Sequence, residues 1–479
     1  MSADKASLPS GWRLEKVSNV SQANPRKATV NIEPNSNVHF VPMASVIENF
    51  GGIDVSKLRP LEEVAKGYTQ FLEGDVLFAK ITPCMENGKL AVVPALEHSV
   101  GYGSTEFHVL RPSASVSARW LANYISQRTF RRVAARNMAG SAGQLRVPAG
   151  WLADQVIPVP PIDDQQEIVA KIEELFSDLD AGIASLERAR AKLKRYRASV
   201  LKSAVEGRLT QDWRAKNTPK ESGAALLKRI LKTRREKWEA AQLKKFADAG
   251  KAPPKGWKEK YSDPVELEAE DLPILPGGWV WATLDQLASL VRNGLPQKPS
   301  PNPPGFQILR ISAVRPMQVN LAKDRYLDIQ RGAAEDYFIK TGDLLFTRYN
   351  GSLDFLGVAG LVRSSEEDIL YPDKLIRVQL VEAAQMPEYV EIAANCGESR
   401  KHIAGKARTT AGQTGVSGTD IKATPIPVPS LDEQHEIIAL ADAMLTSIAR
   451  AESDIEAQLV RGALLKQAIL KRAFEGRLV

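Results

Sequence analysis

Side chains that could act as nucleophiles, metal ligands or general acids and bases are few in this sequence and stand far apart. The 479 residues contain two cysteines, Cys84 and Cys396, and five scattered histidines without a His-Glu-x-x-His motif. These counts exclude a disulfide framework and a cysteine zinc cluster. Asp75 and Asp343 each follow a glycine, a pattern that favours shaping a turn over acid–base work.

Phosphate-binding and methyl-transfer motifs are incomplete as well. The Gly-Lys pair at residues 405–406 is followed by Ala407, and Arg400 stands where a P-loop needs its first glycine. Asn-Pro-Pro at residues 302–304 resembles the Asn-Pro-Pro-aromatic motif of amino-group DNA methyltransferases. However, Gly305 follows it, and no glycine-rich cofactor loop accompanies it. We expect that this chain catalyses nothing by itself.

Composition places the chain among ordinary globular proteins. Hydrophobic residues make up 43% and charged residues 25% of the sequence, which rules out a wholly disordered chain. The length suggests two to four domains. No apolar run approaches the roughly 18 residues of a membrane span, and the first residues lack a signal-peptide core. We expect a soluble cytoplasmic protein.

Positive charge is concentrated in the middle of the chain. Residues 188–245 hold 19 Lys/Arg against 5 Asp/Glu, a local net charge of +14, whereas the whole chain carries +7. Such a segment indicates a surface for nucleic acid or for an acidic protein. A solvated helical face is the alternative interpretation.

The sequence repeats itself with an offset of 267 to 269 residues. Leu-Pro-x-Gly-Trp at residues 8–12 returns at 275–279, and Ile-Pro-Val-Pro at 157–160 returns at 426–429. Glu-Gly-Arg-Leu at 206–209 returns at 475–478, and the matches between these motifs keep the same order. This regularity indicates a tandem duplication.

Each copy begins with about 150 residues of short strand-like runs broken by Gly and Pro, which predict a compact α+β domain. We expect the Ile-Pro-Val-Pro segment to end that domain, because proline cannot continue a strand ladder or a helix interior. Asp163 and Asp432 then stand where a helix N-cap belongs.

A long helix with coiled-coil spacing follows in each copy. Apolar residues recur at sevens, which marks a helix that packs along its length against another helix. One row of each helix carries Ile172, Leu179, Leu186 and Leu193, and Ile448, Ile455 and Ile469, with Leu465 in the second row of the later helix. Small residues at seam positions suggest close backbone approach at intervals: Gly182 and Ala189 in the earlier helix, and Ala451 and Gly462 in the later helix. Two unrelated amphipathic helices remain the alternative.

The predicted fold is therefore α+β: two similar globular domains joined by two long helices that pack as an antiparallel coiled coil, in a pseudo-twofold tandem repeat. We expect a first domain at 1–160, a first helix at 161–210, a basic helical linker at 211–272, a second domain at 273–428 and a second helix at 429–479.

Over essentially its whole length, the sequence resembles the specificity subunits of type I restriction–modification systems. The most specific signatures are the segments that open the two helices, at residues 160–168 and 429–437, together with the paired Glu-Gly-Arg-Leu ends. Segments 81–89, 101–107, 348–352, 371–377 and 410–413 resemble recurrent parts of the family's target-recognition domains.

The resemblance implies a sequence-specific DNA-binding subunit in which each domain reads one half of a bipartite, asymmetric target. Helix length would set the unread spacer. The implied partners are double-stranded DNA, two modification (methyltransferase) subunits docked on the helices, and restriction (motor and nuclease) subunits. S-adenosylmethionine and ATP with Mg²⁺ would bind to those partners, so we expect no cofactor and no metal in this chain.

Base reading needs Arg, Lys, Asn or Gln side chains in a groove, supported by phosphate contacts. We chose polar residues in or beside glycine-containing loops as candidates. In the first domain these are Lys80, Thr82, Asn87, Lys89, Ser104, Thr105, Gln144 and Arg146, and in the second Arg348, Tyr349, Asn350, Lys374, Arg377, Lys401, Arg408, Thr409 and Gln413. Each could equally have a structural or phosphate-only role.

Two other functions stay open on the sequence alone. One is a duplicated scaffold that binds proteins and never DNA, and the other is a divergent methyltransferase built on residues 302–304. Salt-dependent binding to a duplex separates the DNA reader from the scaffold.

Overall fold

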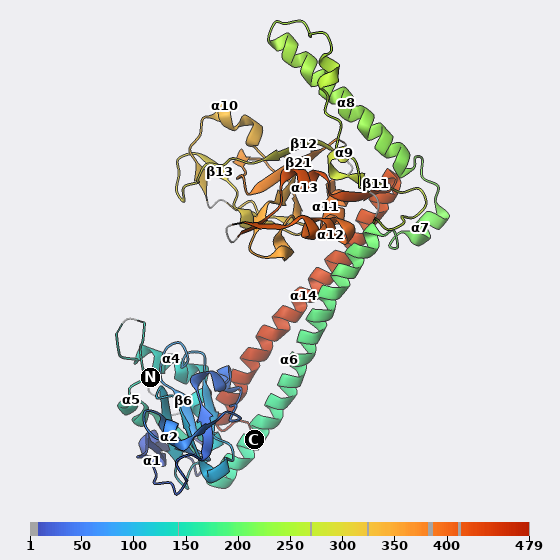
Figure 1. The fold of residues 1–479 in the computed structure, drawn as a ribbon. Coiled ribbons are helices and arrows are strands. Elements are labelled where there is room, and N and C mark those ends of the chain that lie inside the picture. Colours follow the sequence, from blue (N-terminus) through green and yellow to red (C-terminus); the bar gives the residue numbers. More distant parts are fainter. Residues whose placement is uncertain are drawn as a thin grey trace. The chain divides into compact units, whose positions relative to one another are not determined.

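The chain forms two compact units, each made of segments from both repeats. Our computed structural model describes residues 8–141, 143–268, 271–322, 325–381, 387–410 and 413–478. Unit 1 comprises Met1–Ala189 and Asp454–Val479, and unit 2 comprises Arg190–Ser453. Two 44-residue helices, α6 (Ile162–Val205) and α14 (Leu431–Phe474), each contribute one part to each unit (Figure 1).

Two four-stranded sheets form the globular part of unit 1. The first has the order β2 (Ser21–Ala23), β9 (Phe107–Pro112), β6 (Val76–Ala79) and β7 (Leu90–Val92). The second has the order β4 (Leu58–Pro60), β3 (Asn37–Val41), β8 (Val100–Gly103) and β5 (Thr69–Leu72), with β3 and β8 parallel. Helix α3 (Ala118–Ser126) buries Trp120 and Leu121 in the same core as Phe78 of the first sheet.

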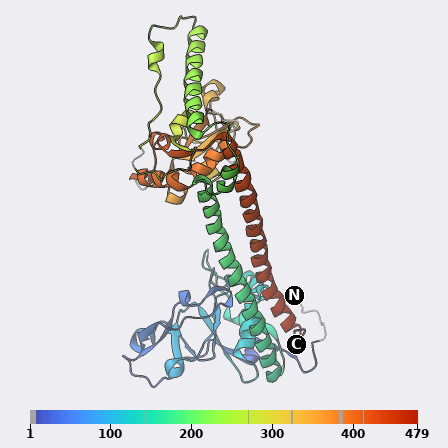
Figure 2. The ribbon, with the colours of Figure 1, turned by 90° about the vertical axis from the view of Figure 1, so that its right-hand side faces the viewer.

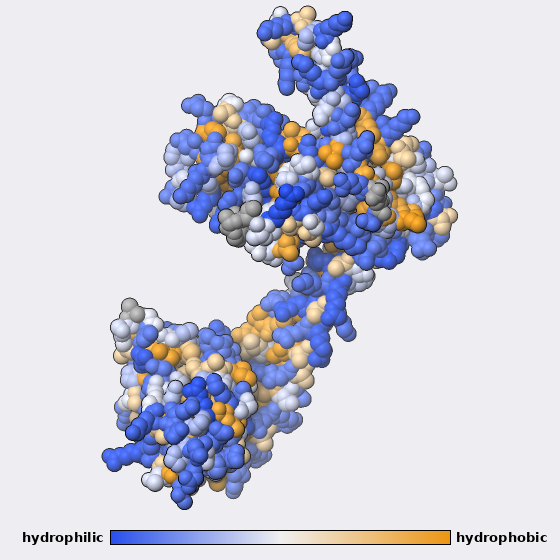
Figure 3. Space-filling model, viewed as in Figure 1, coloured by the Kyte–Doolittle hydropathy of each residue, from blue (hydrophilic) through white to orange (hydrophobic). Residues whose placement is uncertain are grey.

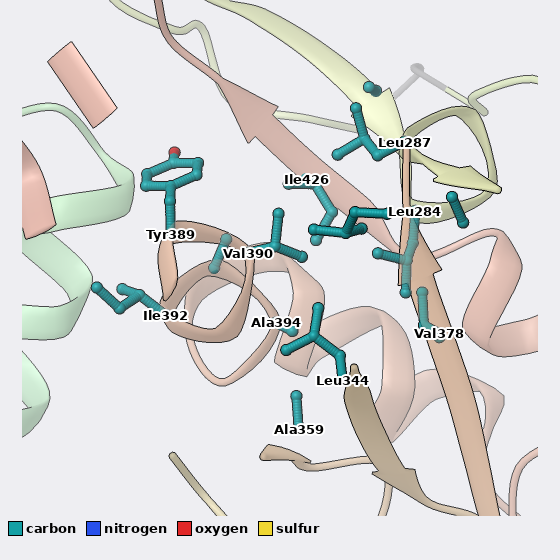
Figure 4. Packing of buried hydrophobic residues seen from close by; sticks show 14 of the residues in the cluster. Leu284, Leu287, Leu344, Ala359, Val378, Tyr389, Val390, Ile392, Ala394 and Ile426 are labelled. Carbon is teal, nitrogen blue, oxygen red and sulfur yellow. The ribbon is translucent and has the colours of Figure 1, made fainter. Parts of the chain in front are cut away.

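Unit 2 repeats this topology. Its four-stranded sheet has the order β12 (Ala288–Asn293), β21 (Leu375–Leu380), β17 (Leu344–Thr347) and β19 (Ala359–Leu361). A second sheet joins β16 (Tyr326–Leu327), β13 (Phe306–Ile308) and β20 (Ile369–Leu370), again with one parallel pair. Helix α11 (Pro387–Ala394) brings Tyr389 and Val390 into a core with Leu344, Val378 and Ile426 (Figure 4). The predicted α+β class is confirmed.

The Ile-Pro-Val-Pro segments form strands, which corrects our expectation that proline would end the domain there. β10 (Val156–Val159) pairs with β1 (Arg13–Lys16), and β24 (Pro425–Val428) pairs with β11 (Val280–Thr283). Each ladder has only two strands, so a proline can sit where no N–H is needed. The carbonyls of Pro158 and Pro427 accept hydrogen bonds from the Trp120 indole (2.9 Å) and the Tyr389 hydroxyl (2.8 Å).

Both long helices begin slightly earlier than their expected caps. Helix α6 starts at Ile162, so Asp163 lies in its first turn instead of capping it. Helix α14 starts at Leu431, and the Ser430 hydroxyl accepts the N–H of Glu433 (3.2 Å). Carboxylates in the first turn still interact favourably with the helix dipole.

Helices α6 and α14 pack antiparallel, as predicted. In unit 1 Lys466 pairs with Asp180, while a Cβ built on Gly462 would lie 3.3 Å from Ile183. In unit 2 the guanidinium of Arg197 pairs with Glu452 at 2.6 Å. Residue numbers fall along α14 as they rise along α6 (Figures 1 and 2).

The predicted seam departs by one residue at one place in each helix. Ile172, Ile448 and Ile469 are buried, and Leu179, Leu186, Leu193 and Ile455 are partly buried, as expected of a seam. Leu465, however, is 47% exposed, which corrects its assignment to the seam. Its neighbour Lys466 faces α6, where its ammonium pairs with Asp180 and lies over the Phe176 ring. Likewise Gly182 is exposed and Ile183 makes the contact.

Each Leu-Pro-x-Gly-Trp turn packs against the end of the helix from the other repeat. Gly207 and Gly476 follow α6 and α14 with left-handed φ values of +69° and +66°, which favour glycine. A Cβ at Gly207 would lie 2.5 Å from Pro276, and one at Gly476 would lie 2.1 Å from Pro9. The turn of one copy and the helix end of the other therefore meet within each unit.

The linker contains two helices, α7 (Gln211–Lys216) and α8 (Gly223–Asp248), in agreement with the predicted basic helix. The base of α8 buries Leu226 and Ile230 in the core of unit 2. Farther along α8, Trp238 stacks on Trp257 with ring centroids 5.9 Å apart. The chain that follows α8 therefore runs back along this helix (Figure 2). The loop around residues 302–304 is exposed. Among the described helices, none combines the length and apolarity of a membrane crossing.

Candidate nucleic-acid interface

Three segments of unit 1 meet at the end of strand β6, and most of the candidate residues lie on them. The N–H of Lys80 donates to the carbonyl of Glu106 (2.9 Å), and the N–H of Val147 donates to the carbonyl of Lys80 (2.8 Å). The N–H of Thr82 donates to the carbonyl of Leu145 (3.0 Å). Segments 80–82, 104–106 and 144–147 therefore form one loop cluster, which we call reading loop cluster 1.

An ion pair fixes the shape of reading loop cluster 1. Arg146 donates from Nε and Nη2 to the two carboxylate oxygens of Glu106, at 2.9 and 2.8 Å, and from Nη1 to the Gln144 carbonyl at 3.3 Å. The hydrogen bond from Arg146 lowers the pKa of the Glu106 carboxyl. Because its fork is already engaged, Arg146 positions the loops, and the exposed neighbours Thr105 and Gln144 are freer to reach a ligand.

The buried side chain of His108 contacts the backbone of reading loop cluster 1. Burial lowers the pKa of His108, so its ring is neutral at pH 7. The Nε2 atom lies 2.8 Å from the Val147 carbonyl, and Nδ1 lies 3.0 Å from the Asn24 amide nitrogen. A neutral ring with the proton on Nε2 satisfies both contacts. Sequence reasoning missed Glu106 and His108, because nothing in the motif spacing pairs them with residues 144–147.

The remaining candidates of unit 1 have partners of their own. Thr82 and Ser104 accept backbone N–H groups, from Leu145 (3.3 Å) and Glu106 (3.2 Å). Asn87 donates to the Glu48 carboxylate at 2.8 Å, and the partly buried Lys89 donates to the Met43 carbonyl at 3.0 Å. The structure thus keeps the last two outside reading loop cluster 1.

Unit 2 builds the same backbone frame at the end of β17. The N–H of Arg348 donates to the Lys374 carbonyl (2.8 Å), and the N–H of Val416 donates to the Arg348 carbonyl (3.0 Å). Strands β18 (Tyr349–Asn350), β23 (Gln413–Gly415) and β22 (Arg408–Thr410) complete reading loop cluster 2. Their pairings match the isolated bridges that Arg146 makes with Ile81 and Ala139 in unit 1.

Different side chains occupy this common frame. The guanidinium of Arg348 lies over the Tyr349 ring at 4.9 Å, and Asn350 accepts the N–H of Ser352. Lys374, Arg408 and Thr409 are exposed. The side chain of Gln413 lies outside the described part of the structure. Cluster 2 therefore presents an arginine, a lysine and an aromatic ring where cluster 1 presents a lysine, a threonine and an ion pair.

Two candidates of unit 2 do not belong to reading loop cluster 2. Arg377 is only 4% exposed and donates to the carbonyls of Phe338 and Asp336, so its charge supports the core and cannot reach a ligand. Lys401 pairs with Glu398 at 2.7 Å, and this bond, with a smaller contribution from Glu206 beyond α6, raises the pKa of Lys401. The side chain of Lys401 is 75% exposed, so its role in DNA binding stays a prediction. The assignment of Arg377 is corrected, because its guanidinium is buried.

The two Gly-Asp pairs shape turns, as predicted. Asp75 accepts the N–H of Leu72 and Asp343 accepts the N–H of Lys340, each at 2.7 Å. In the described part of the chain, no group of three or more His, Cys, Asp or Glu side chains could hold a metal ion.

A second surface, which the sequence reasoning missed, lies between α4 (Arg128–Arg136) and α14. A groove of about 700 Å³ has arginines 128, 131 and 132 on one wall and Val460 and Leu464 on the other. Figure 3 shows hydrophobic residues gathered over α14 in unit 1. The i, i+3, i+4 spacing of the arginines, without an acidic residue in the helix, was the available signal.

Comparison with known proteins gives consistent relatives. The EcoKI type I restriction enzyme specificity subunit of Escherichia coli K12 is 30% identical over 490 residues, covering 100% of this chain and 91% of the relative. The StySPI specificity subunit of Salmonella potsdam is 24% identical and covers 99% and 91%. A scan against protein-family models gave no match.

Solved structures share the fold. A chain from a study of complex assembly and conformational transition of the type I R-M system aligns with a TM-score of 0.68 and 18% identity, over 98% of this chain and 99% of that chain. The HsdS subunit of Thermoanaerobacter tengcongensis aligns over the full length of both chains, with a TM-score of 0.54 and 17% identity. With the tandem repeat, the antiparallel helices and the full-length relative at 30% identity, the chain belongs to the family of type I restriction enzyme specificity subunits.

Proposed function

We propose that this chain is the sequence-specific DNA-binding subunit of a type I restriction–modification complex, with one half of a bipartite, asymmetric target read by each unit. The observation that carries the proposal is the common frame of the two reading loop clusters, filled with different side chains. Equal frames suit two equivalent stretches of duplex, and unequal side chains suit two different base sequences. Cluster 2 contributes exposed Lys374 and Arg408, which suit phosphate or guanine contacts.

The long helices have two roles in this proposal. Their length sets the spacer between the half-sites, in the way that dimer geometry sets half-site spacing in other DNA-binding proteins. Their outer faces dock two modification subunits. Exposed Val460, Leu464 and Leu465 on α14, with the arginines of α4 beside them, support that docking, because apolar residues with arginine are typical of protein interfaces.

Catalysis belongs to the partners in this proposal. The modification subunits carry S-adenosylmethionine and methylate adenine, and the restriction subunits carry ATP with Mg²⁺, the motor and the nuclease. The chain itself contributes recognition and assembly. Its Cys84 and Cys396, partly buried within their own units, suit structural places.

The test is DNA binding and methylation by the complex assembled with modification subunits. We expect methylation mapping to return two different short sequences separated by a fixed gap. Affinity for a duplex with that site should fall about 10³- to 10⁵-fold between 50 and 200 mM salt if six to ten phosphates are contacted. A protein-binding scaffold would show no such salt dependence, and a continuous methylated motif would contradict the two-reader arrangement.

A further inference from the structure

A pocket of about 280 Å³ lies in unit 1 between the first turns of α6 and the Leu-Pro-Ser-Gly-Trp turn. Trp12 and Ile168 supply apolar walls, Asp164 and Glu167 supply two exposed carboxylates, and Gly476 closes the far side. Among the described residues, no cationic side chain lies within 4 Å of either carboxylate. In the described part of the chain, the pocket is therefore lined by the Trp12 ring and by two carboxylates without a cationic partner.

The equivalent place in unit 2 is occupied by the chain itself. Trp279, Glu433 and Gly207 are the counterparts of Trp12, Asp164 and Gly476 in the repeat. The guanidinium of Arg214 lies over the Trp279 ring at 5.9 Å, bonds to the Glu433 carboxylate, and donates from Nη2 to the Gly207 carbonyl at 2.8 Å. Unit 2 therefore shows which chemical group this arrangement accepts.

A longer stretch of the linker wraps the same helix start in unit 2. The Thr210 hydroxyl donates to Glu433 at 2.7 Å, and the N–H of Lys220 donates to Asp432 at 3.3 Å. Among the described residues, Asp163, Asp164 and Glu167 of unit 1 receive no corresponding donors, so the first turn of α6 stays open to solvent. Among the described residues, this basic segment therefore contacts the helix start of unit 2 and has no counterpart at the helix start of unit 1.

We propose that the unit 1 pocket is a docking socket for an arginine side chain of a partner polypeptide, in the position that Arg214 takes in unit 2. A guanidinium stacks on an indole ring and presents a fork of donors to a carboxylate and to the carbonyl at a helix end. An ammonium matches only the charge. Nucleic acid does not suit the pocket, because two carboxylates repel phosphates.

The identity of the partner rests on the proposed function, which makes a modification subunit the expected donor of the arginine. The socket itself can be tested without that partner. Val479 stands at the repeat position of Thr210, so a copy of residues 211–217 appended after Val479 places an arginine in register with the pocket. The matched control is the same extension with its arginine replaced by glutamine.

We expect the arginine extension to raise the melting temperature of the full chain by about 2–4 °C, and the glutamine extension to leave it unchanged. The arginine extension should also compete with the partner. Binding of one modification subunit should weaken at least about tenfold, while the glutamine-extended chain still binds two.

The outcomes separate the socket from the proposed function. Equal melting temperatures for the two extensions overturn the socket, and so does undiminished binding of both modification subunits by the arginine-extended chain. A lowered melting temperature in Lys5→Gln would assign the pocket to the chain's own first residues and likewise overturn it. Failure of the unextended chain to bind any modification subunit contradicts the proposed function, whereas the melting-temperature comparison would still stand.

Discussion

Replacing Phe474 with alanine lowers the free energy of unfolding of unit 1 by about 3–5 kcal/mol. Phe474 is the last residue of α14 and is 7% exposed. Its ring packs edge-to-face against Trp120 and Tyr124, with ring centroids 4.5 and 5.1 Å apart, respectively. The helix end of the second repeat thus fills the core of the first domain, and truncation leaves a cavity between aromatic residues.

Hydrogen–deuterium exchange of the full chain measures this effect locally. Amides of α3 in Phe474→Ala should exchange more than about 100-fold faster, because each 1.4 kcal/mol corresponds to tenfold. Leu464→Ala is the matched control on the same helix, since Leu464 is 57% exposed and its loss should change stability by less than about 0.5 kcal/mol. Unchanged exchange in Phe474→Ala would show that unit 1 does not depend on α14.

Replacing Arg214 with alanine lowers the stability of unit 2 by about 3 kcal/mol, because it leaves the Glu433 carboxylate buried without its cation. Glu433 is 2% exposed and accepts bonds from Arg214, the Thr210 hydroxyl and the Trp279 indole (2.8 Å). Breaking a buried pair costs more than the pair contributes, since the remaining charge keeps its desolvation penalty.

Chemical denaturation of four variants isolates the pair. In a Glu433→Gln background, Arg214→Ala should cost clearly less than it does alone. Arg208→Ala is the control in the same segment, because Arg208 is 59% exposed and pairs with Glu206 at the surface, where ion pairs contribute less than about 1 kcal/mol. If Arg214→Ala lowered the free energy of unfolding equally in the wild-type and Glu433→Gln backgrounds, the Arg214–Glu433 pair would not stabilise unit 2.

The elements that repeat could be predicted from the sequence, and the contacts between repeats could not. Residues 76–79 and 344–347 became strands in equivalent sheets, because a short apolar run that follows a Gly-Asp turn is a local signal. The packing of Pro9 on Gly476 joins residues more than 460 positions apart. No periodicity within one segment reveals such a pairing.

The errors have physical causes that act above the level of local pattern. Proline at 158 and 427 fits a strand because a two-stranded ladder leaves half of its N–H positions unused. Lys466 replaces Leu465 in the helix seam because its long stem can lie over Phe176 while its ammonium reaches Asp180. Heptad spacing alone identifies one row of seam residues, but it does not decide which adjacent residue belongs to the second row.

For the candidate site, glycine-containing loops located the two clusters but not the role of each side chain. Arg348 and Lys374 lie together at the end of β17, as expected of a shared surface. Arg377, two residues into β21, is buried because both faces of this strand are covered along residues 375–378. The sequence does not distinguish a loop position such as Lys374 from a strand position such as Arg377. Only the structure shows that the first is exposed and the second buried.

The most direct test of the two-reader account is methylation mapping with variants confined to one cluster. Lys374→Gln with Arg408→Gln in unit 2 should relax or lose one half of the target and leave the other half and the spacer intact. Lys80→Gln with Gln144→Ala in unit 1 should affect only the opposite half. If either pair of substitutions altered both halves together, or neither, the two units would not be separate readers and the account would be contradicted.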